Sequence, residues 1–305
     1  MILYNSSGDI EMVRKGELYN IINVKSRRVD KVSHNRQNKV AVINDFCGFG
    51  RCSLAVSLPI ISAMKLQCCS LPTSIFSNHT GYDSFFCSDY TEYMNAYIDE
   101  WLKLDLRFDG ILTGFLGSPE QIEIVKRFLE IFKTKENFIV IDPVMGDNGK
   151  LYPTYSPILA ERMKSLITYA DILTPNLTEA CILAGIEYRA DIDEKQLYSL
   201  CEKISELGPK KIVVSGLERG DDLENYIYEA EKPPAVIREH KVGICRAGTG
   251  DVFSSMIVAD AVKGKSLVDS VCHASSFIAK ALRRTVELNI PQPDGICFEE
   301  FLSEI

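Results

Sequence analysis

The sequence has no surplus of basic residues and no long uninterrupted apolar stretch. Its 305 residues carry 34 Lys and Arg against 42 Asp and Glu, which gives a formal net charge of −8. A nucleic-acid surface needs basic patches to meet the phosphate backbone, so this balance argues against a nucleic-acid partner. No apolar run reaches the roughly 18 residues of a membrane span. We therefore expect neither nucleic acid nor membrane among its partners.

Local metal-binding and disulfide patterns are also missing. The four histidines are too far apart for a local zinc motif, and no Cys-x-x-Cys occurs. The ten cysteines are scattered through a long chain, and Asp9 and Glu11 stand where a signal peptide would be apolar. These features predict free thiols and a cytoplasmic location, because reducing compartments keep thiols unpaired.

Neither a Walker lysine motif nor the His-Arg-Asp set of protein kinases is present. The chain has instead a glycine-rich run, Arg246-Ala247-Gly248-Thr249-Gly250-Asp251, followed by apolar residues at helical spacing up to Val262. Glycines allow close approach of backbone N–H groups, and a helix N-terminus carries about half a positive charge. This run predicts an anion site, with Asp251 able to take a proton from an attacking hydroxyl. The alternative is an ordinary helix start, with Thr249 or Asp251 as its cap.

The first 39 residues differ in composition from the rest. They contain eight Lys or Arg against four Asp or Glu and show no clear hydrophobic period. We predict a basic, flexible N-terminal extension over residues 1–39, with a regulatory or partner-binding arm as the alternative. Residues 40–305 are expected to form a single domain, because the 46% hydrophobic content is ample for one core.

Strand-like and helical patterns alternate through that domain. After a first strand and glycine turn, the pattern predicts a helix over residues 52–65. The alternation is typical of a mainly parallel sheet with helices on both faces, which is a three-layer α/β/α sandwich. Further strands are expected near 67–75, 108–115, 137–142, 170–174, 210–215, 226–228 and 235–237. Further helices are expected near 88–104, 118–133, 156–168, 193–207, 250–263, 266–286 and 297–304.

Polar residues follow each of the first six predicted strands. Since ligands of such sheets gather beyond the carboxyl ends of the strands, these residues predict a binding site at one sheet edge. Each group taken alone is also what a turn requires. The groups are Asn44-Asp45, Ser77-Asn78-His79-Thr80-Gly81, Thr113-Gly114, Asp142-Pro143-Val144-Met145-Gly146-Asp147, Thr174-Pro175-Asn176-Leu177-Thr178-Glu179 and Ser215-Gly216.

Taken together, these motifs resemble the ribokinase-like superfamily of small-molecule kinases, and within it the vitamin B6 kinases, which phosphorylate pyridoxamine or pyridoxal. The resemblance runs in collinear order from residue 40 to 303 and includes Gly48-Phe49-Gly50-Arg51-Cys52-Ser53-Leu54 and Gly248-Thr249-Gly250-Asp251. It implies a ribokinase-like fold and an ATP-dependent kinase that phosphorylates the 5′-hydroxymethyl group of a B6 vitamer in the salvage of pyridoxal 5′-phosphate. The extension has no counterpart in the family.

The resemblance also implies a role for each site residue. Asp251 would be the catalytic base, and the backbone of Gly248, Thr249 and Gly250 would bind the transferring phosphoryl group. Asp142 and Glu179 would hold Mg²⁺ with its waters, while Asn176, Ser215, Gly248 and Gly250 would contact ATP. The substrate ring would be bound by Asn44, Asp45, His79 and Thr80.

Relatives are usually homodimers, and some use a monovalent cation such as K⁺, so both are implied here. Asn44-Asp45 before a glycine-rich loop is nearer to the hydroxymethylpyrimidine kinases of the same superfamily, which makes that activity the alternative. The longer motif from Ser77 to Gly81 favours the B6 group. A non-catalytic vitamer-binding protein on the same fold is a third reading, although the intact Gly-Thr-Gly-Asp argues against it.

Overall fold

The computed structural model describes residues 2–4, 10–12, 37–152 and 155–305. The chain divides into two units, Met1–Arg36 and Gln37–Ile305. In the first unit, β1 (Ile2–Tyr4) pairs antiparallel with β2 (Ile10–Met12). The other residues of that unit lie outside the described ranges, so the flexibility predicted for the extension stays a prediction.

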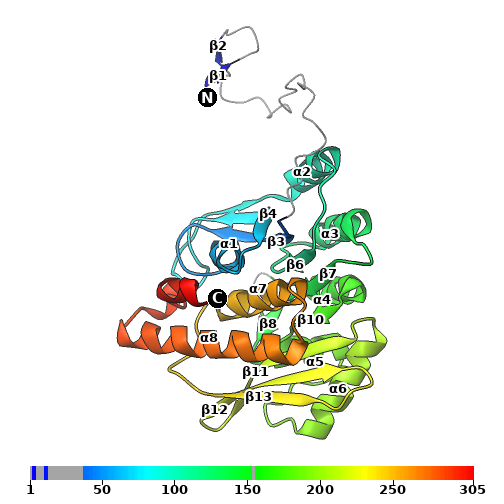
Figure 1. Cartoon of the computed structure of the whole chain (residues 1–305), viewed down its shortest axis with the longest axis vertical. Helices are drawn as coiled ribbons and strands as arrows, with labels where there is room; N and C mark the ends of the chain where they lie inside the picture. The colour runs from blue at the N-terminus through cyan, green and yellow to red at the C-terminus, as the bar shows by residue number, and fades with distance from the viewer. Residues whose placement is uncertain (1, 5–9, 13–36, 153–154) are drawn as a thin grey trace. The chain divides into compact units, whose positions relative to one another are not determined.

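The second unit is built on a nine-stranded sheet (Figure 1). Its strands are β3 (Lys39–Cys47), β4 (Gln67–Phe76), β5 (Cys87–Asp89), β6 (Gly110–Thr113), β7 (Phe138–Ile141), β10 (Ile172–Leu173), β11 (Lys211–Arg219), β12 (Asp222–Glu229) and β13 (Ala235–His240). They lie in the order β13-β12-β11-β10-β7-β6-β3-β4-β5. The strands from β11 to β4 are parallel to one another, and antiparallel strands complete both edges. A separate hairpin joins β8 (Gly146–Asp147) to β9 (Lys150–Leu151).

Helices cover both faces of this sheet (Figure 1). On one face pack α1 (Leu54–Ala63), α7 (Thr249–Val262) and α8 (Leu267–Glu287), and on the other α2 (Thr91–Lys103), α3 (Pro119–Phe132), α4 (Pro157–Leu166), α5 (Leu177–Ala184) and α6 (Glu194–Glu206). Short 3-10 helices are η1 (Ile167–Tyr169), η2 (Gln292–Asp294) and η3 (Glu299–Glu304). Successive side chains of β3 point to opposite faces of the sheet. Val40 and Val42 pack in the core on the α7 side, while Ala41 and Ile43 pack in the core on the other side. The predicted three-layer sandwich is confirmed.

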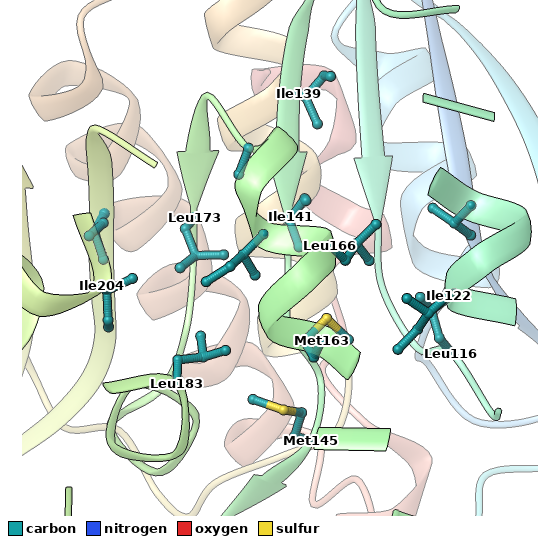
Figure 2. Packing of buried hydrophobic residues seen from close by; sticks show 14 of the residues in the cluster. Leu116, Ile122, Ile139, Ile141, Met145, Met163, Leu166, Leu173, Leu183 and Ile204 are labelled. Atoms are coloured by element: carbon teal, nitrogen blue, oxygen red, sulfur yellow. The ribbon is translucent and has the colours of Figure 1, made fainter. Parts of the chain in front are cut away.

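A close-packed apolar core fills the space between the sheet and helices α3 to α6. Figure 2 shows Ile141 of β7 and Leu173 of β10 facing Met163 and Leu166 of α4, and all four side chains are almost completely buried. Such packing fixes the ends of the strands from which the polar loops emerge. Within the described ranges, no helix combines the length and apolarity needed to cross a bilayer. All ten cysteines are free, as predicted.

One helix was missed by the sequence pattern. α5 begins at Leu177 with Asn176 as its N-cap, and the Asn176 and Glu179 side chains each bond the other residue's backbone N–H. This capping box is a readable signal, since Asn and Glu stand three residues apart just before an apolar run. A short edge strand, β5, also occupies the start of the helix predicted from residue 88.

Two polar groups predicted to follow strands lie inside them instead. β3 continues past Asn44 and Asp45 to Cys47, with a register shift against β4 at this point. β11 continues past Ser215 and Gly216 to Arg219, with a similar shift against β12. The physical reason is a bulge in each pair, which leaves residues unpaired and turns their side chains without ending the strand.

Candidate active site

The N-terminus of α7 is shaped by Gly248. This glycine is the N-cap residue in the left-handed conformation, with φ of 83°, and a Cβ there would lie 2.2 Å from the carbonyl oxygen of Arg51. Gly248 has no side chain with which to cap the helix, and the Thr249 hydroxyl donates back to the Arg246 carbonyl at 3.0 Å. The first backbone N–H groups of α7 have no intrahelical acceptor. The backbone N–H of Asp251 itself lowers the pKa of its carboxyl, so the alternative of an ordinary helix start capped by Thr249 or Asp251 stays a hypothesis beside the anion site.

Asp251 lies in the first turn of α7, half-buried, and is held by groups from the opposite loops. Its Oδ1 accepts a hydrogen bond from Asn44 Nδ2 at 3.1 Å, and the backbone N–H of Ser53 is a second donor that lowers the pKa of this carboxyl. Burial raises the pKa of Asp251, while these two donors and the nearby His79 lower it in part. The result is a fixed carboxyl with increased proton affinity, as a general base requires.

Asp45 is a second acid beside this base, and only 6% of its surface is exposed. Burial raises its pKa to about 7, the Ser53 hydroxyl opposes that shift by donating a hydrogen bond, and the negative charge of Asp251 adds to it. Asn44 connects Asp45 to the loop that follows β6, because its Oδ1 accepts hydrogen bonds from the backbone N–H groups of both Asp45 and Phe115, at 3.0 and 2.8 Å.

Asp142 and Glu179 form the next pair of acids. Burial raises the pKa of Asp142, and the charges of Glu179 and Asp251 raise it further. Burial raises the pKa of Glu179 to about 8, although its two oxygens accept from the N–H groups of Met145 and Asn176 at 3.0 and 2.9 Å. The capping role of Glu179 and a role toward a cation are compatible, since each carboxylate oxygen can accept more than one partner.

Charge coupling and close contacts join most of the predicted residues at one edge of the sheet. A Cβ at Gly250 would lie 3.9 Å from Asp142 Oδ2, which puts that carboxyl at the start of α7. Asn176 and Ser215 are bridge partners on neighbouring chain segments, and Asn176 Nδ2 also donates to the Gly146 carbonyl at 2.8 Å. These contacts connect the predicted nucleotide residues to the hairpin that follows Asp142.

His79 and Thr80 differ in how firmly the structure holds them. His79 lies against Gly50, its N–H donates to the Phe49 carbonyl at 2.9 Å, and its Nδ1 accepts from the N–H of Gly81 at 3.1 Å. Because burial lowers the pKa of His79 and Nδ1 is an acceptor, the neutral ring carries its proton on Nε2. Thr80 is exposed and shares no hydrogen bond with the other site residues in the part of the chain described.

Two serines lie next to the acidic side chains of the site, and the sequence patterns did not predict a role for either of them. The Ser254 hydroxyl donates to the Gly250 carbonyl at 2.9 Å, and its proximity lowers the pKa of Asp142 in part. Its spacing, one helical turn after Gly250, is a signal that could have found it. Ser53 contacts both Asp45 and Asp251, and no sequence signal marks that role.

Asp142 and Glu179 could also bind the magnesium ion that the resemblance to the superfamily implies. Among the described residues, no group of three or more His, Cys, Asp and Glu side chains could enclose a metal on its own. Mg²⁺ does not need such a cage, because it usually binds one or two carboxylates together with waters and substrate phosphates. Asp142 and Glu179 provide two buried oxygen donors whose mutual repulsion a cation would relieve, so this donor set fits.

The raised pKa of Asp45 predicts a pH-dependent cost in stability. In the folded protein the pKa of the Asp45 carboxyl is about 7, whereas in the unfolded chain it has its ordinary, lower value. The protonated carboxyl therefore stabilises the folded state fully at pH values below the unfolded pKa. This contribution to the free energy of unfolding is lost as the pH rises through 7. Asp45→Asn removes the titration. We expect the variant to gain about 2–4 kcal/mol relative to wild type between pH 5 and pH 8.5, or several degrees in Tm.

Thermal unfolding of both proteins across that pH range measures the difference. Asp83→Asn is the matched control, because Asp83 is exposed on the surface. A Tm difference between Asp45→Asn and wild type that stays the same from pH 5 to pH 8.5 would contradict the burial of an ionisable Asp45.

Comparison with known proteins identifies the family. A family model described as phosphomethylpyrimidine kinase matches residues 57–293. Among curated relatives, the pyridoxine kinase of Bacillus subtilis is 28% identical over 186 residues, which span 59% of this chain and 66% of that protein. The hydroxymethylpyrimidine/phosphomethylpyrimidine kinase of Aquifex aeolicus is 31% identical over 187 residues, which span 60% and 71%.

Solved structures extend the match over nearly the whole domain. A candidate phosphomethylpyrimidine kinase from Bacteroides thetaiotaomicron, whose orthorhombic crystal form contains pyridoxal, is 36% identical to this chain, with a TM-score of 0.85 over 88% of this chain and 96% of that one. The predicted fold and the resemblance to B6 kinases are thus confirmed. With a family model that covers most of its length and a site of backbone N–H groups and buried acids at one sheet edge, the chain belongs to the phosphomethylpyrimidine kinase family.

Proposed function

We propose that this kinase transfers the γ-phosphoryl group of ATP to the 5′-hydroxymethyl group of a B6 vitamer, namely pyridoxamine, pyridoxine or pyridoxal. The observation that carries the proposal is the Asp251 carboxyl, which lies at the open start of α7 with raised proton affinity and a fixed hydrogen bond from Asn44. Similarity to a protein crystallised with pyridoxal supports the choice of ring.

The chain's own groups divide the reaction between them. Asp251 takes the proton of the 5′-hydroxyl as its oxygen attacks the γ-phosphorus, and the raised pKa of this buried carboxyl favours keeping that proton. The backbone N–H groups of Gly248, Thr249 and Gly250 stabilise the charge on the transferring phosphoryl group. They are fixed dipoles at a helix N-terminus, so they need no rearrangement during the reaction.

The ring-binding residues complete the acceptor side. Asn44, Asp45, His79 and Thr80 address the ring nitrogen and ring substituents in this proposal. Asn44 also ties that side to the base, through its hydrogen bond to Asp251. His79 offers its Nε2 proton as a donor, since Nδ1 already accepts from the Gly81 N–H.

On the nucleotide side, Asp142 and Glu179 would hold Mg²⁺, and Asn176 and Ser215 would contact the ATP phosphates. When bound, the ion offsets the charge of those phosphates. A monovalent cation such as K⁺ and a homodimeric assembly belong to the same proposal. The free cysteines support a cytoplasmic location, since reducing compartments keep thiols unpaired.

A second candidate is hydroxymethylpyrimidine kinase. The family description and the Aquifex aeolicus relative favour it, as does the Asn44-Asp45 pair before the glycine-rich loop. The two reactions share the base and the phosphate site, so they differ only in the ring that the pocket accepts.

ATP consumption in the presence of Mg²⁺ and each B6 vitamer tests the proposal. We expect turnover that depends on the added vitamer and yields its 5′-phosphate. Vitamer binding without any ATP consumption would contradict the kinase reaction and favour a catalytically silent binding protein.

A further inference from the structure

Ser53 adopts a backbone conformation that suits glycine better than serine. It is the N-cap residue of α1, with φ of 57° and ψ of −138°. Residues with a Cβ rarely adopt positive φ, because the side chain then crowds the backbone. Only 7% of Ser53 is exposed, so the residue is enclosed in this conformation. Strained residues of this kind cluster at functional sites, so the role of the Ser53 side chain is of interest.

Both acids of the acceptor side are partners of Ser53. Its hydroxyl lowers the pKa of the Asp45 carboxyl, and its backbone N–H lowers the pKa of the Asp251 carboxyl, as nearby donors do. Its carbonyl accepts from the N–H groups of Val56 and Ser57, both at 3.0 Å, and so starts α1. One residue therefore connects the predicted ring-binding carboxyl, the predicted base and a rigid helix.

The surrounding chain fixes Ser53 from both sides. Ser53 forms an antiparallel bridge with Phe46, which closes the glycine-rich loop between them. Two residues before Ser53, the Arg51 carbonyl lies so close to Gly248 and Gly295 that a Cβ on either glycine would come within 2.8 Å of it. These constraints keep Ser53 at positive φ without any help from its side chain.

The groups facing Asp45 make the hydroxyl important. The charges that act on it come from Asp251 of α7, Cys47 at the end of β3, Cys52 of the glycine-rich loop and Cys87 of β5. None of these titratable neighbours is a cation, within the residues described. The Ser53 hydroxyl is thus a principal favourable partner of the Asp45 carboxyl.

We propose that Ser53 is a positioning residue, whose hydroxyl orients Asp45 toward the ring while its N–H orients Asp251 toward the hydroxyl to be phosphorylated. This inference rests on the proposed function for the roles of the two acids. Ser53 itself touches neither substrate nor phosphate and acts through Asp45 and Asp251.

Two substitutions separate the hydroxyl from the backbone. Ser53→Gly removes the hydroxyl and relieves the positive φ, whereas Ser53→Ala removes the hydroxyl and keeps the strained conformation. Ser270→Ala is the control, because Ser270 is a buried helix serine in α8 that donates to the Ser266 carbonyl at 2.8 Å, away from the acids.

We expect both Ser53 variants to raise the vitamer KM about tenfold, the usual effect of losing a hydrogen bond to a charged group. The KM for ATP should stay within about twofold, because the phosphate side is untouched. The Tm of Ser53→Gly should not fall below that of wild type, and the Tm of Ser53→Ala should be lower than that of Ser53→Gly. A purely structural serine would not combine unimpaired stability with a loss confined to the vitamer.

A substrate-free measurement keeps this inference separate from the proposed function. Carboxyl ¹³C NMR of Asp-labelled full-length protein follows the titration of Asp45 directly. We expect its pKa to rise in both Ser53 variants, because the hydroxyl that lowers it is gone, and to be unchanged in Ser270→Ala.

The outcomes distinguish the two ideas. If wild type phosphorylates no B6 vitamer but the Asp45 titration moves as expected, the proposed function fails and the contact of Ser53 with Asp45 stands. If wild type is active, yet the Ser53 variants match Ser270→Ala in vitamer KM and in Asp45 titration, Ser53 only starts α1 and the inference is overturned.

Discussion

Asp251→Asn should lower kcat by about 10²–10⁴ while the KM for ATP changes little. The amide keeps the size of the side chain and can still accept a hydrogen bond from Asn44, so the start of α7 should remain intact. It cannot accept the proton of the attacking hydroxyl. Steady-state kinetics with a B6 vitamer and ATP measure both parameters.

Asp269→Asn is the matched control for this substitution. Asp269 is also an acid in the first turn of a helix, α8, where it bonds the N-cap Ser266. A carboxylate that merely favours a helix N-terminus contributes well under about 2 kcal/mol to stability and nothing to chemistry. If Asp251→Asn keeps more than about a tenth of wild-type kcat, as Asp269→Asn should, Asp251 is a helix residue and its catalytic role must be withdrawn.

Gly250→Ala should leave the fold intact and still abolish most activity. A Cβ at Gly250 meets nothing closer than Asp142 Oδ2 at 3.9 Å, and the backbone of Gly250 is helical, so the protein itself has room for a side chain. In a helix, alanine is if anything the more stable residue. We nevertheless expect kcat/KM to fall by about 10²–10³, because the added methyl group occupies the space where the phosphoryl group would meet the backbone N–H groups.

Gly248→Ala provides the contrast. Its Cβ would clash with the Arg51 carbonyl, and its φ of 83° disfavours any side chain, so we expect a large loss of stability along with the activity. Thermal unfolding and kinetics of the two variants separate a glycine required by the fold from one required by the ligand. Wild-type kcat/KM in Gly250→Ala would show that no phosphoryl group approaches the start of α7.

The alternation of strands and helices was predictable because apolar periodicity reports burial directly. The position of the site was predictable for a similar reason, since Asp142 and Thr174 directly follow short buried strands. Sequence patterns did not predict the two bulges that keep Asp45 and Ser215 inside their strands. A bulge is decided by pairing between two strands, and the periodicity of one strand alone does not contain that information.

The electrostatics of the site depend on contacts between distant segments. Ser53 lies eight residues after Asp45 and about 200 before Asp251, and only the folded chain brings the three together. The positive φ of Ser53 could not be predicted from the sequence either, because serine rarely adopts this conformation. The capping box of Asn176 and Glu179, by contrast, follows a local rule and was within reach of the sequence.

The most direct test of the central claim is a competition for phosphoryl transfer in one vessel. Wild-type protein, ATP and Mg²⁺ are given equal concentrations of pyridoxal, pyridoxamine, pyridoxine and hydroxymethylpyrimidine, and the initial ratio of phosphorylated products is read by mass spectrometry. Since competing substrates divide according to kcat/KM, we expect a B6 vitamer 5′-phosphate to form ahead of hydroxymethylpyrimidine phosphate. A predominance of hydroxymethylpyrimidine phosphate would contradict the proposed B6 kinase activity and assign the pocket to the pyrimidine ring.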